Sequence, residues 1–247
     1  MKSFVLLVVL ASCMSSADDN TPIQPGGVGG IGGVSGGTTG GGAGSSSDGG
    51  GGVTSRVCVV TDLRTPTSNC DTQNLAGMTV TIGSQSAFTA ADGTFALTIP
   101  NEPNLVAAVT GGPSGATVSS LVPMSATSAP VVLPAVRPAT LSTLADNNAV
   151  TLDPAAGQLF LNAVNANGTG IAEIEAAASQ STAQLLFEGT DVIWNGQSTG
   201  IHGAVWLTNA IAGDVSMTLS KTGSNPLTVS GLPIQPGAVT FVATQFQ

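Results

Sequence analysis

The chain contains a single histidine, His202, so a histidine-dependent hydrolase could be centred only there. A Ser-His-Asp site would use it as the general base, and Asp191 or Asp214 could orient its ring. The sequence lacks the Gly-x-Ser-x-Gly motif of a nucleophile held on a sharp turn. His202 also lies between glycines, at 200–203, a setting typical of a turn. We therefore expect no enzymatic activity, and a hydrolase centred on His202 is the least favoured alternative.

Three glutamates could in principle form the carboxylate pair of a glycoside hydrolase: Glu173, Glu175 and Glu188. The first two alternate with the apolar residues Ile174 and Ala176. This period of two is typical of a strand with one solvated face. We expect the glutamates to lie on that outward face and to have no catalytic role.

Oxygen ligands for calcium are present at 146–148 and at Asp62 and Asp71, but they do not form a spaced ligand loop. Loop solvation explains these residues more simply. A metal site at Cys58 and Cys70 would lack nearby partners, because His202 lies more than a hundred residues away. We expect no metal and no cofactor.

The chain has three cysteines, Cys13, Cys58 and Cys70. Disulfides persist in an exported protein, so the three cysteines would divide into one with a separate role and one disulfide-bonded pair. A Cys58–Cys70 disulfide would close a loop of about a dozen residues, worth roughly 3 kcal/mol in the chain-entropy description. A two-cysteine metal site is the competing interpretation.

The first residues have the layout of a secretory signal peptide. Lys2 precedes an apolar run at 4–10, which is too short for a membrane span of roughly 20 residues. The following Leu-Ala-Ser-Cys, at 10–13, resembles the bacterial lipobox, in which the signal is cut before the cysteine and its thiol is acylated. The resemblance implies a signal peptide at 1–12 and lipidation of Cys13. An ordinary signal peptide with an incidental cysteine is the alternative. No Asp follows Cys13, which favours the outer membrane in a Gram-negative host.

Composition limits the partners of the chain. The formal net charge is −9, with five Lys and Arg residues, which excludes extensive contact with phosphates and makes nucleic acid an unsuitable partner. Residues 13–52 contain the lipidation site and a Gly/Ser-rich linker that cannot bury enough surface to fold. As a random coil, its r.m.s. reach is roughly 35 Å. Membrane attachment would therefore come from the N-terminal lipid.

Residues 54–135 predict a β-sandwich, because short alternating strands are separated by turn residues. Asp92-Gly93 is a hairpin signal, since this pair accepts the positive φ of a tight turn, and Phe95 begins the next core face. The expected strands are 57–60, 78–82, 95–99, 105–109, 118–122 and 131–133.

Two stretches of this region resemble the carboxypeptidase regulatory-like domain. They are Leu-Ala-Gly-Met-Thr-Val-Thr-Ile at 75–82 and the stretch at 89–100, which begins with a Thr-x-x-Asp-Gly-x-Phe pattern and closes on Pro100. That family is a transthyretin-like β-sandwich and is typically non-catalytic. The resemblance implies display or interaction, with Asp92, Gly93 and Phe95 forming the hairpin signature. The segment from Cys58 to Cys70 is longer than the first loop of the family.

Residues 157–247 predict a second, degenerate β-sandwich after a connector at 134–153. A helix at 173–186 is the competing interpretation, because this segment is rich in helix formers. Asn167-Gly168 is a turn signal rather than part of a glycosylation site. The expected strands are 159–164, 170–176, 192–194, 204–207, 215–219, 227–229 and 239–242.

Trp194 and Trp206 are the largest side chains of the second module, and we expect them in its core. Exposed in a groove, they would instead favour a carbohydrate-, peptide- or calcium-binding module. The sequence as a whole predicts a lipid-anchored protein of the bacterial cell envelope, periplasmic or surface-facing. It would display non-catalytic β-sandwiches in a structural or interaction role, with an envelope protein or surface partner.

Overall fold

A computed structural model of the chain describes residues 54–71, 73–112, 117–126, 129–189 and 193–247. Over these residues the protein is an all-β protein of sandwiched sheets, with fifteen strands and one helix. This confirms the predicted fold class. Cys13 and the linker at 13–52 lie outside the described residues, so the structure does not test their predicted roles.

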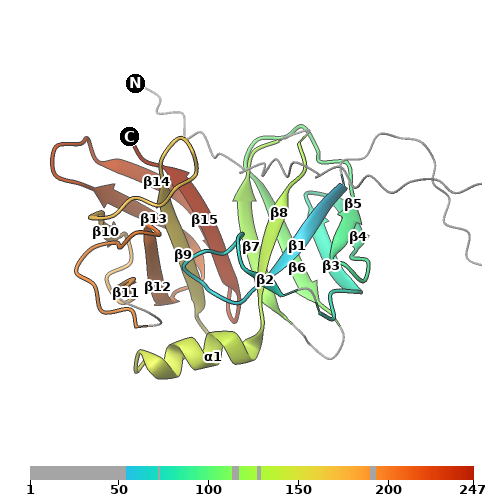
Figure 1. Ribbon diagram of the computed structural model, residues 1–247, viewed down its shortest axis with the longest axis horizontal. Helices are drawn as coiled ribbons and strands as arrows, with labels where there is room; N and C mark the ends of the chain where they lie inside the picture. Colours follow the sequence, from blue (N-terminus) through green and yellow to red (C-terminus); the bar gives the residue numbers. More distant parts are fainter. Residues whose placement is uncertain (1–53, 72, 113–116, 127–128, 190–192) are drawn as a thin grey trace, which may run out of the picture. The chain divides into compact units, whose positions relative to one another are not determined.

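The first half of the fold is a sandwich of two small sheets (Figure 1). Strands β4, β3, β6 and β7 form one layer, and β5, β1 and β8 form the other, where β1 and β8 run parallel. Val80, Ile82 and Leu133 are buried between the layers. The strands are β1 (Thr54–Val60), β2 (Cys70–Asp71), β3 (Met78–Ile82), β4 (Gln85–Phe88), β5 (Thr94–Ala96), β6 (Leu105–Gly111), β7 (Thr117–Met124) and β8 (Val132–Val136).

The second half is also a sandwich. Its layers are β11-β12-β9-β15 and β10-β13-β14. Leu161, Leu207 and Met217 lie in the core between them. The strands are β9 (Gly157–Val164), β10 (Glu175–Ala178), β11 (Gln184–Phe187), β12 (Ala204–Ala210), β13 (Gly213–Ser220), β14 (Leu227–Ile234) and β15 (Val239–Gln245).

One strand, β15, joins the two halves into a continuous sheet. It pairs in parallel with β9 over its whole length, and in parallel with β7 at Val239 and Thr240. The resulting order is β11-β12-β9-β15-β7-β6-β3-β4. Every residue of β9 is buried, because both faces of the sheet are covered at this position. The mainly apolar sequence of β9, with Gln158 and Asn162 as its polar residues, is the pattern expected of such a strand.

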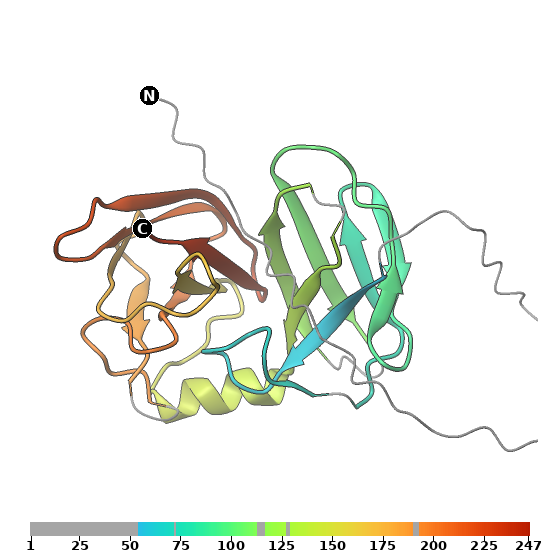
Figure 2. The ribbon, with the colours of Figure 1, turned by 45° about the horizontal axis from the view of Figure 1, so that its top comes forward.

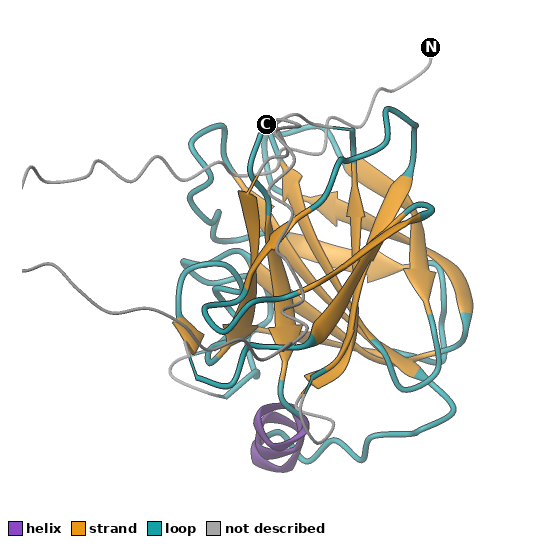
Figure 3. Cartoon of the chain, turned by 90° about the vertical axis from the view of Figure 1, so that its right-hand side faces the viewer, coloured by secondary structure: helices purple, strands orange, loops and turns teal. Residues whose placement is uncertain are grey.

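A helix, α1 (Pro138–Asn147), occupies half of the connector expected at 134–153. Pro138 occupies the first turn, where a missing amide hydrogen is tolerated. Leu141, Leu144 and Ala145 are buried at helical spacing. They contact the face of β9, β12 and β15 that points away from the sandwich core, and α1 lies at one end of the strands (Figure 3). Among the described residues, no helix is long and apolar enough to cross a membrane.

The Asp92-Gly93 turn forms, but it does not close a hairpin between paired strands. Gly93 has φ +80°, and Asp92 accepts hydrogen bonds from the Thr94 amide at 3.0 Å and hydroxyl at 2.7 Å, which lower the pKa of Asp92. The strands on either side pair elsewhere, β4 with β3 and β5 with β1. The hairpin prediction was therefore wrong, because the turn carries the chain from one layer to the other. Phe95 is buried, as expected.

Two strand predictions in the second half also need correction. Glu173 has φ +66°, a left-handed conformation that a strand cannot accommodate, so β10 begins only at Glu175. Ile193 and Trp194 form no strand, because the Trp194 amide donates to the side chain of Asn148 instead, at 2.6 Å. The competing helix at 173–186 is absent, since these residues form β10 and β11.

Candidate functional site

The predicted disulfide is present. Cys58 in β1 and Cys70 in β2 are bonded, with their Cα atoms 4.9 Å apart. It closes the loop at 61–69 at its base, where Thr61 donates from its amide (3.1 Å) and hydroxyl (2.9 Å) to the Asn69 carbonyl. In Figure 2 this loop, in blue, extends from β1 toward the second half of the chain. We call residues 61–69 the disulfide loop.

An ion pair stiffens the disulfide loop. The Arg64 guanidinium contacts the Asp62 carboxylate at 2.8 Å, and the Arg64 amide donates to the same carboxylate at 3.0 Å. Partial burial raises the pKa of Asp62, but the hydrogen bonds and charge of Arg64, helped by His202, outweigh it. The pKa of Asp62 therefore lies below its usual value, and Asp62 is ionised at neutral pH.

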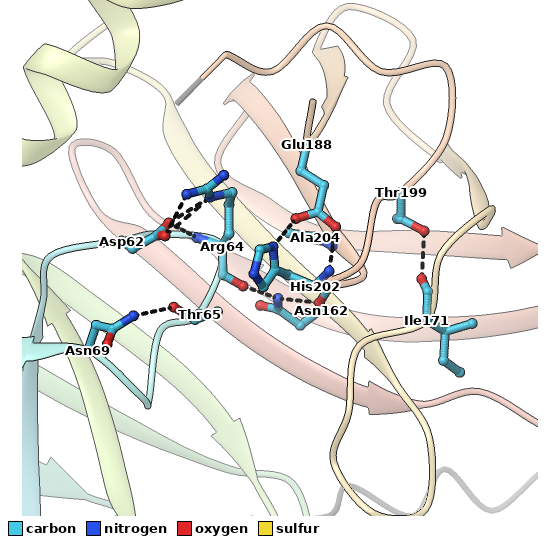
Figure 4. A network of polar contacts seen from close by, with 10 residues as sticks. All are labelled: Asp62, Arg64, Thr65, Asn69, Asn162, Ile171, Glu188, Thr199, His202 and Ala204. Carbon is cyan, nitrogen blue, oxygen red and sulfur yellow. Dashed lines mark hydrogen bonds and ion pairs between the residues drawn. The ribbon is translucent and has the colours of Figure 1, made fainter. Parts of the chain in front are cut away.

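Glu188 and His202 form the centre of the polar network in Figure 4. The Glu188 carboxylate is 2.8 Å from His202 Nδ1 and accepts a hydrogen bond of 2.7 Å from the His202 amide. The Glu188 side chain is 1% exposed, whereas that of His202 is 30% exposed. The expectation that Glu188 lies on an outward strand face was therefore wrong. Glu173 and Glu175 are exposed, as expected.

Glycines allow the His202 turn to lie against the sheet. Gly203 has φ +68°, and its carbonyl accepts a hydrogen bond of 2.8 Å from the Ala163 amide. A Cβ atom at Gly203 would lie 2.1 Å from the Ala163 carbonyl oxygen, closer than atoms can approach. The glycine-flanked histidine therefore belongs to a turn, as predicted, and the turn brings the ring to the buried carboxylate of Glu188.

Asn162, in β9, links this turn to the disulfide loop. Its Nδ2 donates to the Arg64 carbonyl at 2.7 Å and to the His202 carbonyl at 3.2 Å. Its Oδ1 is buried and has no hydrogen-bond partner among the described residues. Beside it lies a cavity of about 260 Å³, which Arg64, Asn162 and His202 help to line.

The network does not meet the requirements of the predicted hydrolase alternative. A Ser-His-Asp site needs a hydroxyl at the free ring nitrogen. Within the described part of the chain, the only side chain hydrogen-bonded to the ring is Glu188. Asp214 is exposed in β13, and Asp191 lies outside the described residues. Glu188 instead holds the turn in place, because it accepts hydrogen bonds from both the backbone and the ring of His202.

Both tryptophans belong to the core, as predicted. Trp206 is 0% exposed and Trp194 is 2% exposed. Phe160 stacks on Trp206 with ring centroids 5.4 Å apart, and on Phe241 at 5.8 Å. These rings fill the space beneath α1. Their burial argues against an exposed aromatic platform for sugars or peptides.

Three of the candidate calcium ligands, Asp62, Asp71 and Asn148, have other partners. Asp62 is paired with Arg64, and Asp71 with Arg137 at 2.9 Å. The Asn148 side chain accepts a hydrogen bond from a backbone amide. Over the described ranges, no group of three or more His, Cys, Asp and Glu side chains could hold a metal ion.

No family model matches the chain, and no curated protein matches it. Among solved structures, a Bacillus anthracis TIE protein is similar over 78% of this chain at 13% identity and a TM-score of 0.27, and the chain spans 34% of its length. GBS52, a minor pilin of Streptococcus agalactiae, is 11% identical over 78% of this chain and 94% of its own, with a TM-score of 0.26. The resemblance of residues 54–135 to the carboxypeptidase regulatory-like domain remains a prediction.

Sequence reasoning overlooked Arg64 and Asn162 as members of the site. Asn162 did carry a signal, since it interrupts the apolar strand Leu-Phe-Leu-Asn-Ala-Val at 159–164. An amide in a fully buried strand requires polar partners. Nothing local to Arg64 indicates that its carbonyl meets β9, because the contact joins residues 98 positions apart.

Proposed function

We propose that this chain is a lipid-anchored protein of the bacterial cell envelope that displays a non-catalytic pair of β-sandwiches. Acylated Cys13 would hold the chain at the membrane, and the linker at 13–52 would lift the folded part away from it. The absence of Asp after Cys13 favours the outer membrane if the host is Gram-negative. The proposed partner is another envelope or surface protein.

The observation that carries the proposal is the Cys58–Cys70 disulfide in a chain that opens with an apolar run and a Leu-Ala-Ser-Cys sequence. Disulfides persist in exported proteins and are rare in the cytosol. The disulfide and the secretory pattern are separate observations, and both support a location outside the cytosol.

The continuous sheet supports a display role. β15 pairs with strands of both halves. The two sandwiches are therefore joined by backbone hydrogen bonds as well as by the segment of chain between β8 and β9. Low charge, at 8% of residues, and hydroxyl-rich faces suit an exported structural domain. We include membership of residues 54–135 in the carboxypeptidase regulatory-like family in the proposal.

Metabolic labelling with an alkyne-bearing palmitate in a bacterial host tests the anchor. The wild-type chain should be labelled and should remain in the membrane fraction after a carbonate wash. Cys13→Ala should abolish both labelling and retention. A Cys58→Ala/Cys70→Ala variant controls for loss of any cysteine and should still be labelled. Processing and membrane retention of Cys13→Ala equal to wild type would refute the anchor.

A further inference from the structure

The pairing between β7 and β15 stops early. Only Val239 and Thr240 of β15 pair with β7, although β15 continues to Gln245. The next bond of this parallel ladder would need an amide hydrogen at position 123. Pro123 has none, which explains why the strands diverge there. The result is a wedge between the two strands, in the middle of the long sheet.

The divergence leaves backbone groups of β15 without a strand partner. The Gln158 amide donates to the Ala238 carbonyl at 2.9 Å, so even-numbered residues of β15 direct their amides and carbonyls toward β9. The amide and carbonyl of Ala243 and the carbonyl of Phe241 therefore face the wedge. On the edge of β15 that faces away from β9, no described strand pairs with these positions.

The cavity of about 260 Å³ lies at this wedge. Its lining is part apolar and part polar. Apolar walls come from β7, β8 and β15, and a polar end comes from β9, the His202 turn and the disulfide loop. Representative lining residues are Val122, Val132, Phe241, Asn162, Thr169 and His202.

A buried polar atom at the cavity lacks a partner. Asn162 Oδ1 is shielded from solvent and accepts no hydrogen bond from a described residue. Such an atom costs roughly 1–3 kcal/mol when it stays unsatisfied, so native proteins rarely leave one. A small movement of the cavity lining would let a donor from a ligand reach and satisfy it.

We propose that the wedge between β7 and β15 binds an extended, uncharged peptide segment of a partner protein, which adds as a short strand to the free edge of β15. A peptide main chain offers alternating donors and acceptors at the spacing of the Phe241 and Ala243 groups. At the border of the cavity, Arg64 is paired with Asp62 and Glu188 is paired with His202, so these groups do not select a charged ligand. This site does not depend on the anchor at Cys13.

Fluorescence anisotropy with the full-length chain tests the proposal. The probe is a fluorescein-labelled pentapeptide, Thr-Val-Thr-Val-Thr, with blocked ends. Its N-methylated counterpart has the same side chains but fewer amide hydrogens. Its affinity should be lower by a factor of about ten or more, since the loss of a few backbone hydrogen bonds accounts for that ratio. Hydrogen exchange of the β15 amides should slow when the parent peptide is bound.

Pro123→Ala is the decisive variant. It returns an amide hydrogen to β7, so the ladder can continue to Phe241 and close the wedge. Residue 123 faces Val106 of β6 in a register that does not use its amide, so folding should be preserved. We expect affinity for the probe to fall about tenfold while the melting temperature is unchanged or higher. Pro233→Ala, at a strand proline of β14 away from the cavity, is the matched control and should bind like wild type.

Three results would overturn the inference. One is a dissociation constant weaker than about 1 mM for the parent peptide. Another is equal affinity for the parent and N-methylated peptides. The third is wild-type affinity in Pro123→Ala. Protection of β15 by a cello-oligosaccharide, without any by the peptide, would also refute it and would assign the cavity to a glycan.

Discussion

Reduction of the Cys58–Cys70 disulfide should destabilise the protein measurably. The bond joins residues 12 positions apart, and the lost loop-closure entropy of such a cross-link corresponds to about 3 kcal/mol. The freed disulfide loop would also lose the 2.7 Å hydrogen bond between the Arg64 carbonyl and Asn162, worth about 1 kcal/mol net. The free energy of unfolding should therefore fall by about 3–4 kcal/mol.

Thermal unfolding of the same chain, oxidised and reduced, measures this loss. For a domain of 150–250 residues, a change of this size lowers the melting temperature by roughly 6–16 °C. Comparing two redox states of one sequence avoids the packing change that replacement of the buried Cys58 would introduce. The Cys58→Ala/Cys70→Ala variant is the control, and reductant should not shift its midpoint.

An identical midpoint with and without reductant in the wild-type chain would refute this reasoning. It would mean that the unfolded chain is already restricted near residues 58–70, or that the bond is absent in the folded protein. A mass measurement that counts free thiols in the oxidised sample separates these two explanations.

Two further perturbations address the polar network. Glu188→Gln should lower the free energy of unfolding, measured by urea denaturation, by about 1–3 kcal/mol, because His202 loses its buried carboxylate partner. Glu175→Gln, at an exposed site, should have little effect in the same measurement. The pKa of Asp62 is lower in the folded state than its unfolded value of about 3.8, so its contribution is complete above that pH and is lost as the pH falls through the folded pKa. Asp62→Asn should therefore flatten the decline in stability below about pH 4. Asp214→Asn, an exposed control, should leave that decline unchanged. Equal acid sensitivity of wild type and Asp62→Asn would contradict the lowered pKa of Asp62.

Strands with one buried face could be predicted from the sequence because their side chains alternate. β3 shows this directly, since Met78, Val80 and Ile82 are buried and the threonines between them are partly exposed. The disulfide was also predictable, because two nearby cysteines without a nearby histidine have few alternatives. These features depend on residues close together in the chain.

Other features depend on contacts that no local pattern records. β4 was missed because three of its four residues are exposed at the edge of the sheet, so it lacks apolar alternation. Glu188 was placed on the surface because its partner, the His202 turn, reaches it through tertiary folding. The β7–β15 pairing joins segments about 120 positions apart, and only Pro123 marks its end.

The place of β15 in the sheet constrains how the polypeptide can mature. β15 follows every other described strand in chain order, yet it lies between β7 and β9. While the chain emerges from a ribosome or a translocation channel, one edge of each of these two strands stays unpaired until β15 is available. Unpaired strand edges can pair with other chains and form aggregates. Assembly of both sandwiches is thus coupled to one late insertion step, and chains interrupted before residue 239 should be substrates for chaperones and proteases.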